Sequence, residues 1–165
     1  MSDDKVLLIT GGSTGIGAAT ARAAVARGYR VALAARTQSK LTTLVDELGG
    51  EAVALPVTCD VTDKASQQAM VATVIERFGQ IDAVFANAGI GGKPGGFTGA
   101  DTDVWKNMIL TNVYGVGLTI QCTAEALKAS RGHLLITGSA AGRATIPGSM
   151  YSATKWAVSA IGYGV

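Results

Sequence analysis

Short apolar segments rich in β-branched residues alternate with amphipathic helical patterns along almost the whole chain. The strand-like segments are residues 6–10, 30–35, 52–57, 81–86 and 133–138, each bounded by Gly, Asn, Asp or Pro. Most lack a polar alternation, as strands do when both faces of a parallel sheet are covered. Strand, helix and strand in repetition predict right-handed βαβ units, and hence an α/β fold with a doubly wound parallel sheet.

The segments between these strands carry apolar residues at helical spacing. Positions i, i+3, i+4 and i+7 are apolar at Leu41, Leu44, Val45 and Leu48, and again at Val71, Val74, Ile75 and Phe78. A third stripe predicts one long helix over residues 103–129, with Trp105, Ile109, Val113, Val116 and Ile120. Asn112 lies on this stripe, so we expect it to be buried with hydrogen-bond partners. The glycine-rich residues 90–103 are predicted to be a loop beside a ligand site.

Composition excludes several classes of protein. With 165 residues, a single domain over 1–165 is expected, and a net charge of +2 argues against nucleic-acid or membrane-surface partners. The longest uncharged stretch, residues 107–124, is too polar for a membrane span. Acidic residues at positions 3 and 4 are unlike a secretory signal, so a cytoplasmic location is expected. Cys59, Cys122 and His133 are too few for a disulfide framework or a metal site.

The first strand runs into a glycine-rich turn, TGGSTGIG at residues 10–17, followed by an Ala-rich helical pattern. Glycines allow a tight turn and close approach of a ligand, and a helix N-terminus attracts phosphate. The P-loop pattern fails because Ala18 and Ala19 follow Gly17, and the spacing of Gly11, Gly15 and Gly17 differs from GxGxxG. The turn therefore indicates a phosphate-binding site of the Rossmann-like kind, with a ligand-free tight turn as the alternative.

The end of the second strand bears on which dinucleotide would bind. An NAD site places an acid there against the ribose 2′-hydroxyl, but this chain has Arg36 and no acid. A guanidinium suits a 2′-phosphate, so NADP(H) is the predicted cofactor, unless Arg36 is only a solvated loop residue.

Tyr151 and Lys155 stand four residues apart, which puts them on one face of a helix. A phenol is a poor base at neutral pH, but a nearby ammonium and a positively charged oxidised nicotinamide both favour the phenolate. Tyr151 could then relay a proton during hydride transfer, while Ser139 holds a carbonyl oxygen. A Tyr–Lys pair alone is commonly just a helix surface.

Six motifs in order resemble the short-chain dehydrogenase/reductase family. They are residues 10–17, Asp60, Asn87-Ala88-Gly89, Asn112, Ser139 and YSATK at residues 151–155. The resemblance implies that Tyr151 is the acid/base, that Lys155 favours its phenolate and holds the nicotinamide ribose, that Ser139 orients substrate and that Asn112 anchors a relay water. It also implies that the cofactor contacts Asp60, Val61 and the loop from Asn87 to Gly89. The full set of expected cofactor-binding residues is Gly11, Ser13, Thr14, Gly15, Ile16, Gly17, Arg36, Asp60, Val61, Asn87, Ala88, Gly89, Tyr151 and Lys155. Some NADP-dependent members of the family carry a basic residue just before the glycine that corresponds to Gly15, but this chain has Thr14 there. Arg36 is therefore the main indication of NADP(H).

Other functions fit less well. A Ser139–His133 hydrolase is excluded because six residues of strand span about 20 Å. The glycine spacing disfavours a dinucleotide-using epimerase or dehydratase. A non-catalytic dinucleotide-binding regulatory module remains the alternative to a carbonyl or secondary-alcohol oxidoreductase. The mostly apolar residues 140–150, with Ile90 and Gly91, predict a substrate of modest polarity, and the resemblance implies a homodimer or homotetramer.

The five predicted strands fall short of the six or seven expected of this fold. The resemblance implies further strands and a substrate loop after the Tyr151–Lys155 helix. We therefore expect residues 1–165 to be the cofactor-binding and catalytic portion of a longer chain.

Overall fold

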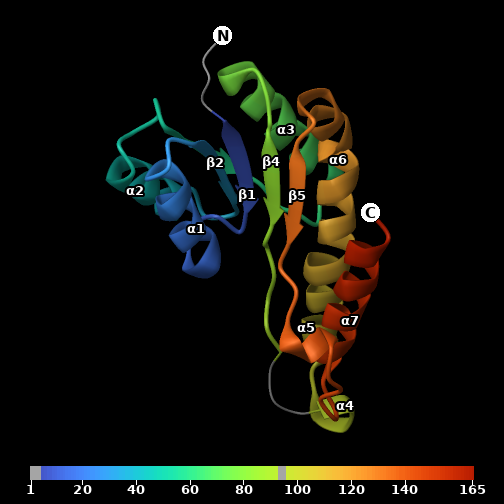
Figure 1. Ribbon diagram of the computed structural model, residues 1–165. Coiled ribbons are helices and arrows are strands. Elements are labelled where there is room, and N and C mark those ends of the chain that lie inside the picture. Colours follow the sequence, from blue (N-terminus) through green and yellow to red (C-terminus); the bar gives the residue numbers. More distant parts are fainter. Residues whose placement is uncertain (1–4, 93–95) are drawn as a thin grey trace.

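A single sheet of five parallel strands forms the centre of the computed structural model, which describes residues 5–92 and 96–165 (Figure 1). The strands are β1 (Val6–Thr10), β2 (Arg30–Ala35), β3 (Ala54–Thr58), β4 (Ala83–Ala86) and β5 (His133–Ile136). Their spatial order is β3-β2-β1-β4-β5, so the direction of winding reverses between β1 and β4. The predicted α/β class and doubly wound parallel sheet are confirmed.

Helices cover both faces of this sheet, as Figure 1 shows. One face packs against α1 (Gly15–Val25) and α2 (Gln38–Glu47), and the other against α3 (Lys64–Phe78) and α6 (Gly115–Ser130). In β1, Val6 and Leu8 belong to the core cluster of α3, whereas Leu7 and Ile9 belong to that of α1 and α2. Alternate residues of β1 thus enter different cores, which explains why its sequence shows no polar alternation.

The edge strand β5 differs from the buried strands. His133 and Leu135 are exposed, whereas Leu134 and Ile136 are half-buried, because β5 lies at the edge of the described sheet with β4 as its neighbour. Coverage of both faces is expected of most strands rather than all, and β5 does not have it.

The prediction of a single helix over residues 103–129 is wrong in one respect, because a π-helical turn interrupts it. The segment consists of α5 (Thr102–Ile109), the π-helical turn η1 (Leu110–Tyr114) and α6. A π turn holds one extra residue, so the buried face shifts at this point. Accordingly Met108 and Asn112 are buried, whereas Ile109 is 43% exposed despite its place in the apolar stripe.

The predicted loop 90–103 is also partly helical, with the single turn α4 (Gly96–Gly99) and the start of α5. Residues 93–95 of that loop lie outside the described residues.

The last helix, α7 (Met150–Tyr163), is capped by Ser149, whose hydroxyl accepts a hydrogen bond from the Ser152 amide at 3.1 Å. It packs against η1 and the 3₁₀ turn η2 (Ala140–Gly142). Gly142 permits this contact, because a Cβ there would collide with the Lys155 carbonyl. These contacts fix the helical turn that carries Tyr151 and Lys155.

Within residues 5–92 and 96–165, no helix combines the length and apolar character that crossing a bilayer requires. The same residues contain no cluster of His, Cys, Asp and Glu able to hold a metal ion. Cys59 and Cys122 are both free thiols.

Candidate functional site

A pocket of about 490 Å³ lies at the carboxyl ends of the strands, next to the point where the winding reverses. In doubly wound sheets this is where ligands bind. Thirteen of the predicted site residues line it: Gly11, Ser13, Thr14, Gly15, Ile16, Arg36, Asp60, Val61, Asn87, Ala88, Gly89, Tyr151 and Lys155. Gly17, Asn112 and Ser139 are not among the lining residues. The structure thus brings together residues from all five strand ends.

The turn from β1 into α1 depends on its glycines. Gly11 and Gly15 have φ values of +64° and +55°, in the left-handed region that favours glycine. Gly17 packs against the carbonyl group of Gly11, which leaves no room for a Cβ. Thr14 precedes α1, and its side chain makes no capping hydrogen bond to the amide groups of the first helical turn. Uncapped amides at a helix N-terminus are suited to an anion such as phosphate.

Asn87 ties three strand ends together beneath the pocket. Its Nδ2 donates to the carbonyl oxygens of Thr10 at 3.1 Å and Gly11 at 3.3 Å, and its Oδ1 accepts from the Thr137 hydroxyl at 3.0 Å. In return, the Thr10 hydroxyl accepts from the amides of Asn87 and Ala88. Asn87 therefore holds the glycine turn in place as well as lining the pocket.

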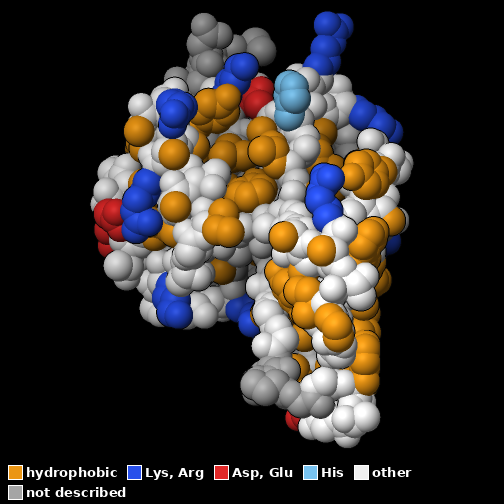
Figure 2. Space-filling view, turned by 60° about the horizontal axis from the view of Figure 1, so that its bottom comes forward, with side chains coloured by type: hydrophobic (Ala, Val, Ile, Leu, Met, Phe, Trp, Pro, Cys, Tyr) orange, Lys and Arg blue, Asp and Glu red, His pale blue; other side chains and the backbone are white. Residues whose placement is uncertain are grey.

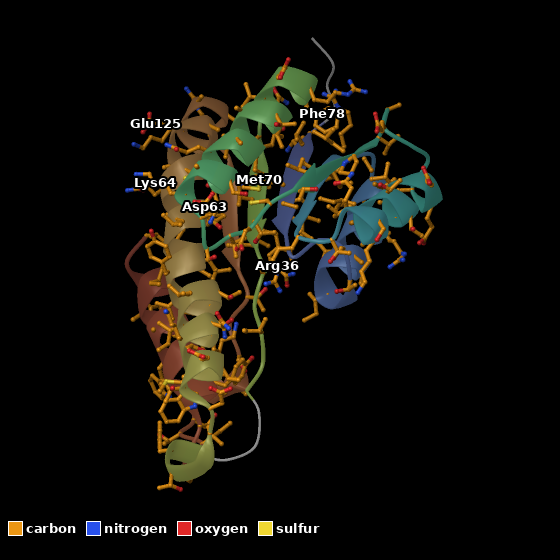
Figure 3. All side chains as sticks on the ribbon, turned by 180° about the vertical axis from the view of Figure 1, so that it is seen from behind. Arg36, Asp63, Lys64, Met70, Phe78 and Glu125 are labelled. Atoms are coloured by element: carbon orange, nitrogen blue, oxygen red, sulfur yellow. The ribbon has the colours of Figure 1, made fainter. Side chains whose placement is uncertain are left out.

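The far end of the pocket carries most of its charge. Arg36 lies just beyond the carboxyl end of β2 (Figure 3), and Lys40 lines the same wall. The Thr62 amide and hydroxyl donate to Asp60 Oδ1 at 2.9 and 2.8 Å. These hydrogen bonds, the amide's first, and the positive charge of Arg36 hold the pKa of Asp60 below its ordinary value. With Lys155, the pocket walls carry three cations and one anion, a balance that favours a phosphate-bearing ligand.

Gln67 of α3 fixes the wall formed by Val61. Its fully buried side chain donates from Nε2 to the carbonyl oxygens of Val61 at 2.7 Å and Gly115 at 3.0 Å. The Val61 wall and the long helix that carries Asn112 are thereby joined through one amide group.

Tyr151 and Lys155 lie at the opposite end of the pocket, one turn apart on α7 as their spacing predicts. Lys155 is only 6% exposed, and its Nζ lies 5.8 Å from the centre of the Tyr151 ring. The ammonium donates to the Thr137 carbonyl oxygen at 2.7 Å. Burial lowers the pKa of Lys155. The Lys155 ammonium is therefore a buried positive charge beside the Tyr151 ring.

Asn112 and Ser139 stand behind the pocket lining. Asn112 is 1% exposed, as expected, and bonds to both backbone groups of Ile90. Ser139 follows β5 and caps η2, its hydroxyl accepting from the Ala141 amide at 3.2 Å. In this arrangement the Ser139 hydroxyl holds its own turn rather than lining the pocket.

The sequence-based prediction missed seven lining residues: Ala34, Ala35, Thr37, Lys40, Cys59, Thr111 and Thr137. Ile90 and Gly91, which we expected to border the site, do line the pocket. Lys40 lies in the first turn of α2, shortly after Arg36, so a search for a second cation near Arg36 would have found it. Thr137 precedes Ser139 by two residues on an extended segment, which puts both on one side. The others contribute backbone or small apolar surface and have no distinct signal.

These features define a dinucleotide-binding α/β protein. An uncapped helix N-terminus, glycines that admit close approach and a cationic wall fit a pyrophosphate and an adenosine end. The half-buried Tyr151 and the buried Lys155 lie at the opposite end of the pocket.

Comparison with known proteins then gives the family. The family described as short chain dehydrogenase matches residues 5–162, and the chain belongs to this family. An uncharacterized oxidoreductase of Listeria monocytogenes is 39% identical over 161 residues, covering 94% of this chain and 63% of that protein. The human dehydrogenase/reductase SDR family member 11 is 32% identical over 174 residues, covering 98% of this chain and 65% of that protein. The chain thus spans less than two thirds of the length of these two relatives.

Solved structures agree. The alcohol dehydrogenase of the archaeon Thermococcus sibiricus, complexed with 5-hydroxy-NADP, superposes with a TM-score of 0.90 at 36% identity, over 96% of this chain and 68% of that chain. A short chain dehydrogenase/reductase of Burkholderia phymatum, in complex with NAD, gives a TM-score of 0.90 at 31% identity, over 98% and 59% of the two chains. The predicted family and Rossmann-like fold are confirmed.

Proposed function

We propose that this protein is an oxidoreductase that transfers a hydride between a nicotinamide dinucleotide and the carbon of a carbonyl or secondary alcohol. The observation that carries the proposal is the buried Lys155 ammonium 5.8 Å from the Tyr151 ring, in the pocket that also holds the glycine turn. A bound nicotinamide would supply or accept the hydride. Tyr151 would give a proton to the carbonyl oxygen or take one from the alcohol, and Lys155 would stabilise its phenolate.

The test is Tyr151→Phe in the full-length protein, with a screen of ketones and secondary alcohols of modest polarity. We expect cofactor binding, measured by NADPH fluorescence, to persist. Turnover should fall by about 10²-fold to 10⁴-fold, the usual contribution of a general acid/base. Tyr163→Phe is the matched control, because Tyr163 lies on the same helix but is 77% exposed. Turnover retained by Tyr151→Phe would contradict the assignment. Cofactor binding by a wild-type protein that turns over no carbonyl would instead favour a regulatory module.

For the cofactor we propose NADP(H) over NAD(H). Arg36 and Lys40 supply two cations to one wall of the pocket, and no acid follows β2 at this point. Hydrogen bonds to charged groups contribute about 1.5 to 3 kcal/mol, so Arg36→Ala should weaken NADPH binding by about 10-fold to 100-fold and leave NADH binding unchanged. Arg27→Ala is the control, since Arg27 is exposed, its guanidinium donates to the Ala23 carbonyl oxygen of its own helix, and it lies outside the pocket lining. Equal affinity of the wild type for NADPH and NADH would overturn the proposal.

We also propose self-association to a homodimer or homotetramer. Figure 2 shows hydrophobic side chains gathered along the projecting part of the molecule, where Figure 1 has α5 and α7. Exposed large residues on these helices and on η1 include Ile109, Tyr114, Trp156 and Tyr163. Light scattering should give two or four times the mass of the chain, and a monomer at micromolar concentration would refute this.

A further inference from the structure

The Thr154 hydroxyl occupies a buried position between Asn112 and the first turn of α7. Thr154 is 2% exposed, and its Oγ1 donates to the Tyr151 carbonyl oxygen at 2.8 Å. The same oxygen accepts a hydrogen bond from Asn112 Nδ2 at 3.1 Å. One hydroxyl thus joins the helix that carries Tyr151 to the π turn that carries Asn112.

The side-chain amide of Asn112 also makes two hydrogen bonds to the backbone of Ile90. Its Oδ1 accepts from the Ile90 amide at 2.8 Å, and its Nδ2 donates to the Ile90 carbonyl oxygen at 2.9 Å. Because the Thr154 proton is used on the Tyr151 carbonyl, Thr154 can only accept from Asn112. If the Asn112 amide were flipped, its oxygen would face two other acceptor oxygens, Thr154 Oγ1 and the Ile90 carbonyl oxygen. Thr154 therefore favours the amide orientation in which Asn112 bonds to both backbone groups of Ile90.

Ile90 lies in the pocket wall together with Tyr151. The loop after it passes close to that tyrosine, because a Cβ built on Gly92 would lie 3.7 Å from the Tyr151 Cβ. The path from Ile90 through Asn112 and Thr154 to the Tyr151 backbone therefore fixes one wall of the pocket relative to the phenol.

We propose that Thr154 is a positioning residue for hydride transfer, acting through Asn112 to set the distance between the Ile90 wall and Tyr151. This proposal rests on the proposed oxidoreductase function. Replacing Thr154 should change turnover rather than cofactor affinity. Thr154 does not line the pocket, and the glycine turn and Arg36 lie at the end of the pocket away from Tyr151. A misplacement of reacting groups by a fraction of an ångström lowers turnover strongly.

The chain offers a matched control for a purely structural role. Thr123 of α6 is fully buried, and its hydroxyl donates to the Thr119 carbonyl oxygen at 2.7 Å, as Thr154 does within α7. Within residues 5–92 and 96–165, the Thr123 hydroxyl makes no hydrogen bond to a residue of the site. Replacement by valine removes the hydroxyl at nearly constant shape in both positions.

The experiment compares Thr154→Val, Thr154→Ser and Thr123→Val in the full-length protein. We expect Thr154→Val to lower kcat by about 5-fold to 100-fold, the equivalent of one lost buried hydrogen bond, while the KM for NADP(H) changes by less than about 3-fold. Thr154→Ser should restore most of kcat because it keeps the hydroxyl. Thr123→Val should lower the midpoint of urea unfolding without lowering kcat. Equal kcat loss in both valine variants, an unchanged kcat in Thr154→Val, or no rescue by serine would overturn the proposal.

A double-mutant cycle with Asn112→Ala tests the route. In the Asn112→Ala background, Thr154→Val should shift the unfolding midpoint less than it does in the wild type, because the shared hydrogen bond is already gone. Equal shifts in both backgrounds would show that Thr154 does not act through Asn112. The unfolding cycle needs no substrate, so a wild type without turnover would overturn the proposed function separately from this coupling.

Discussion

Replacing Gly17 with alanine tests whether glycine is needed at this position because a Cβ would collide with its neighbours. A Cβ on Gly17 would lie 2.9 Å from Asn87 Nδ2 and 3.0 Å from the Gly11 carbonyl carbon, with the Gly11 oxygen closer still. These neighbours are backbone, or an amide held by its own hydrogen bonds, so none can move freely.

The expected magnitude combines three effects. Overpacking costs about 1 to 3 kcal/mol, disruption of the two Asn87 hydrogen bonds costs about 1 kcal/mol each, and alanine gains about 1 kcal/mol of helix propensity. We therefore expect Gly17→Ala to lower the free energy of unfolding by about 2 to 4 kcal/mol and to abolish measurable NADPH binding.

Urea unfolding and NADPH fluorescence titration measure both effects, and Gly117→Ala is the control. Gly117 lies in the interior of α6 with no atom within 4 Å of its would-be Cβ. Alanine there should raise the free energy of unfolding by about 0.8 to 1 kcal/mol and leave cofactor binding unchanged. If Gly17→Ala unfolded within about 0.5 kcal/mol of the wild type and still bound NADPH, the close approach to Gly11 would not be the reason for glycine at this position.

Three further variants test other features. Lys155→Met should abolish turnover yet be at least as stable as the wild type at pH 7, because burial lowers the pKa of Lys155 and the folded protein bears the cost of its charge. That cost is present below the folded pKa and disappears as pH rises toward the ordinary value of about 10.4, so wild-type stability should rise over this window and the methionine variant should lack that rise. Asp60→Asn should lower the free energy of unfolding by about 1 kcal/mol at pH 7. Because the pKa of Asp60 is lowered, its contribution is present above about pH 3.9 and lost as pH falls through the folded pKa, so urea titrations of both proteins should converge in acid. Arg131→Gly should stabilise by about 1 kcal/mol, since Arg131 ends α6 with φ of +54°, and an unchanged unfolding midpoint would contradict this.

Local sequence patterns predicted most of the fold, because strand burial and turn residues act within a few positions. The bounds of β1 and β2 agree with the prediction, and Asp63 caps α3 through the Ser66 amide. The π turn could not be predicted from helical spacing, since one inserted residue rotates the face without changing composition. Asn112 is buried as predicted, but the residue that is buried with it is Met108 rather than Ile109.

The pocket was predictable in outline because the ends of parallel strands share one edge. Lys40 and Thr137 were missed because their part in the pocket depends on side-chain direction and on contacts between distant segments. The place of Ser139 behind the lining depends on the η2 turn, which its neighbouring sequence does not indicate.

The Asn87 bonds also bear on how the protein folds. They connect residues 76 and 77 positions apart on one side and 50 positions apart on the other. Closing such long loops is slow, so these contacts should form after the local βα units. Because the glycine turn has its proper shape only when Asn87 holds it, the ability to bind a dinucleotide should appear late in refolding. Cofactor fluorescence during refolding would then report completion of the whole sheet, whereas far-UV circular dichroism would report the earlier helices.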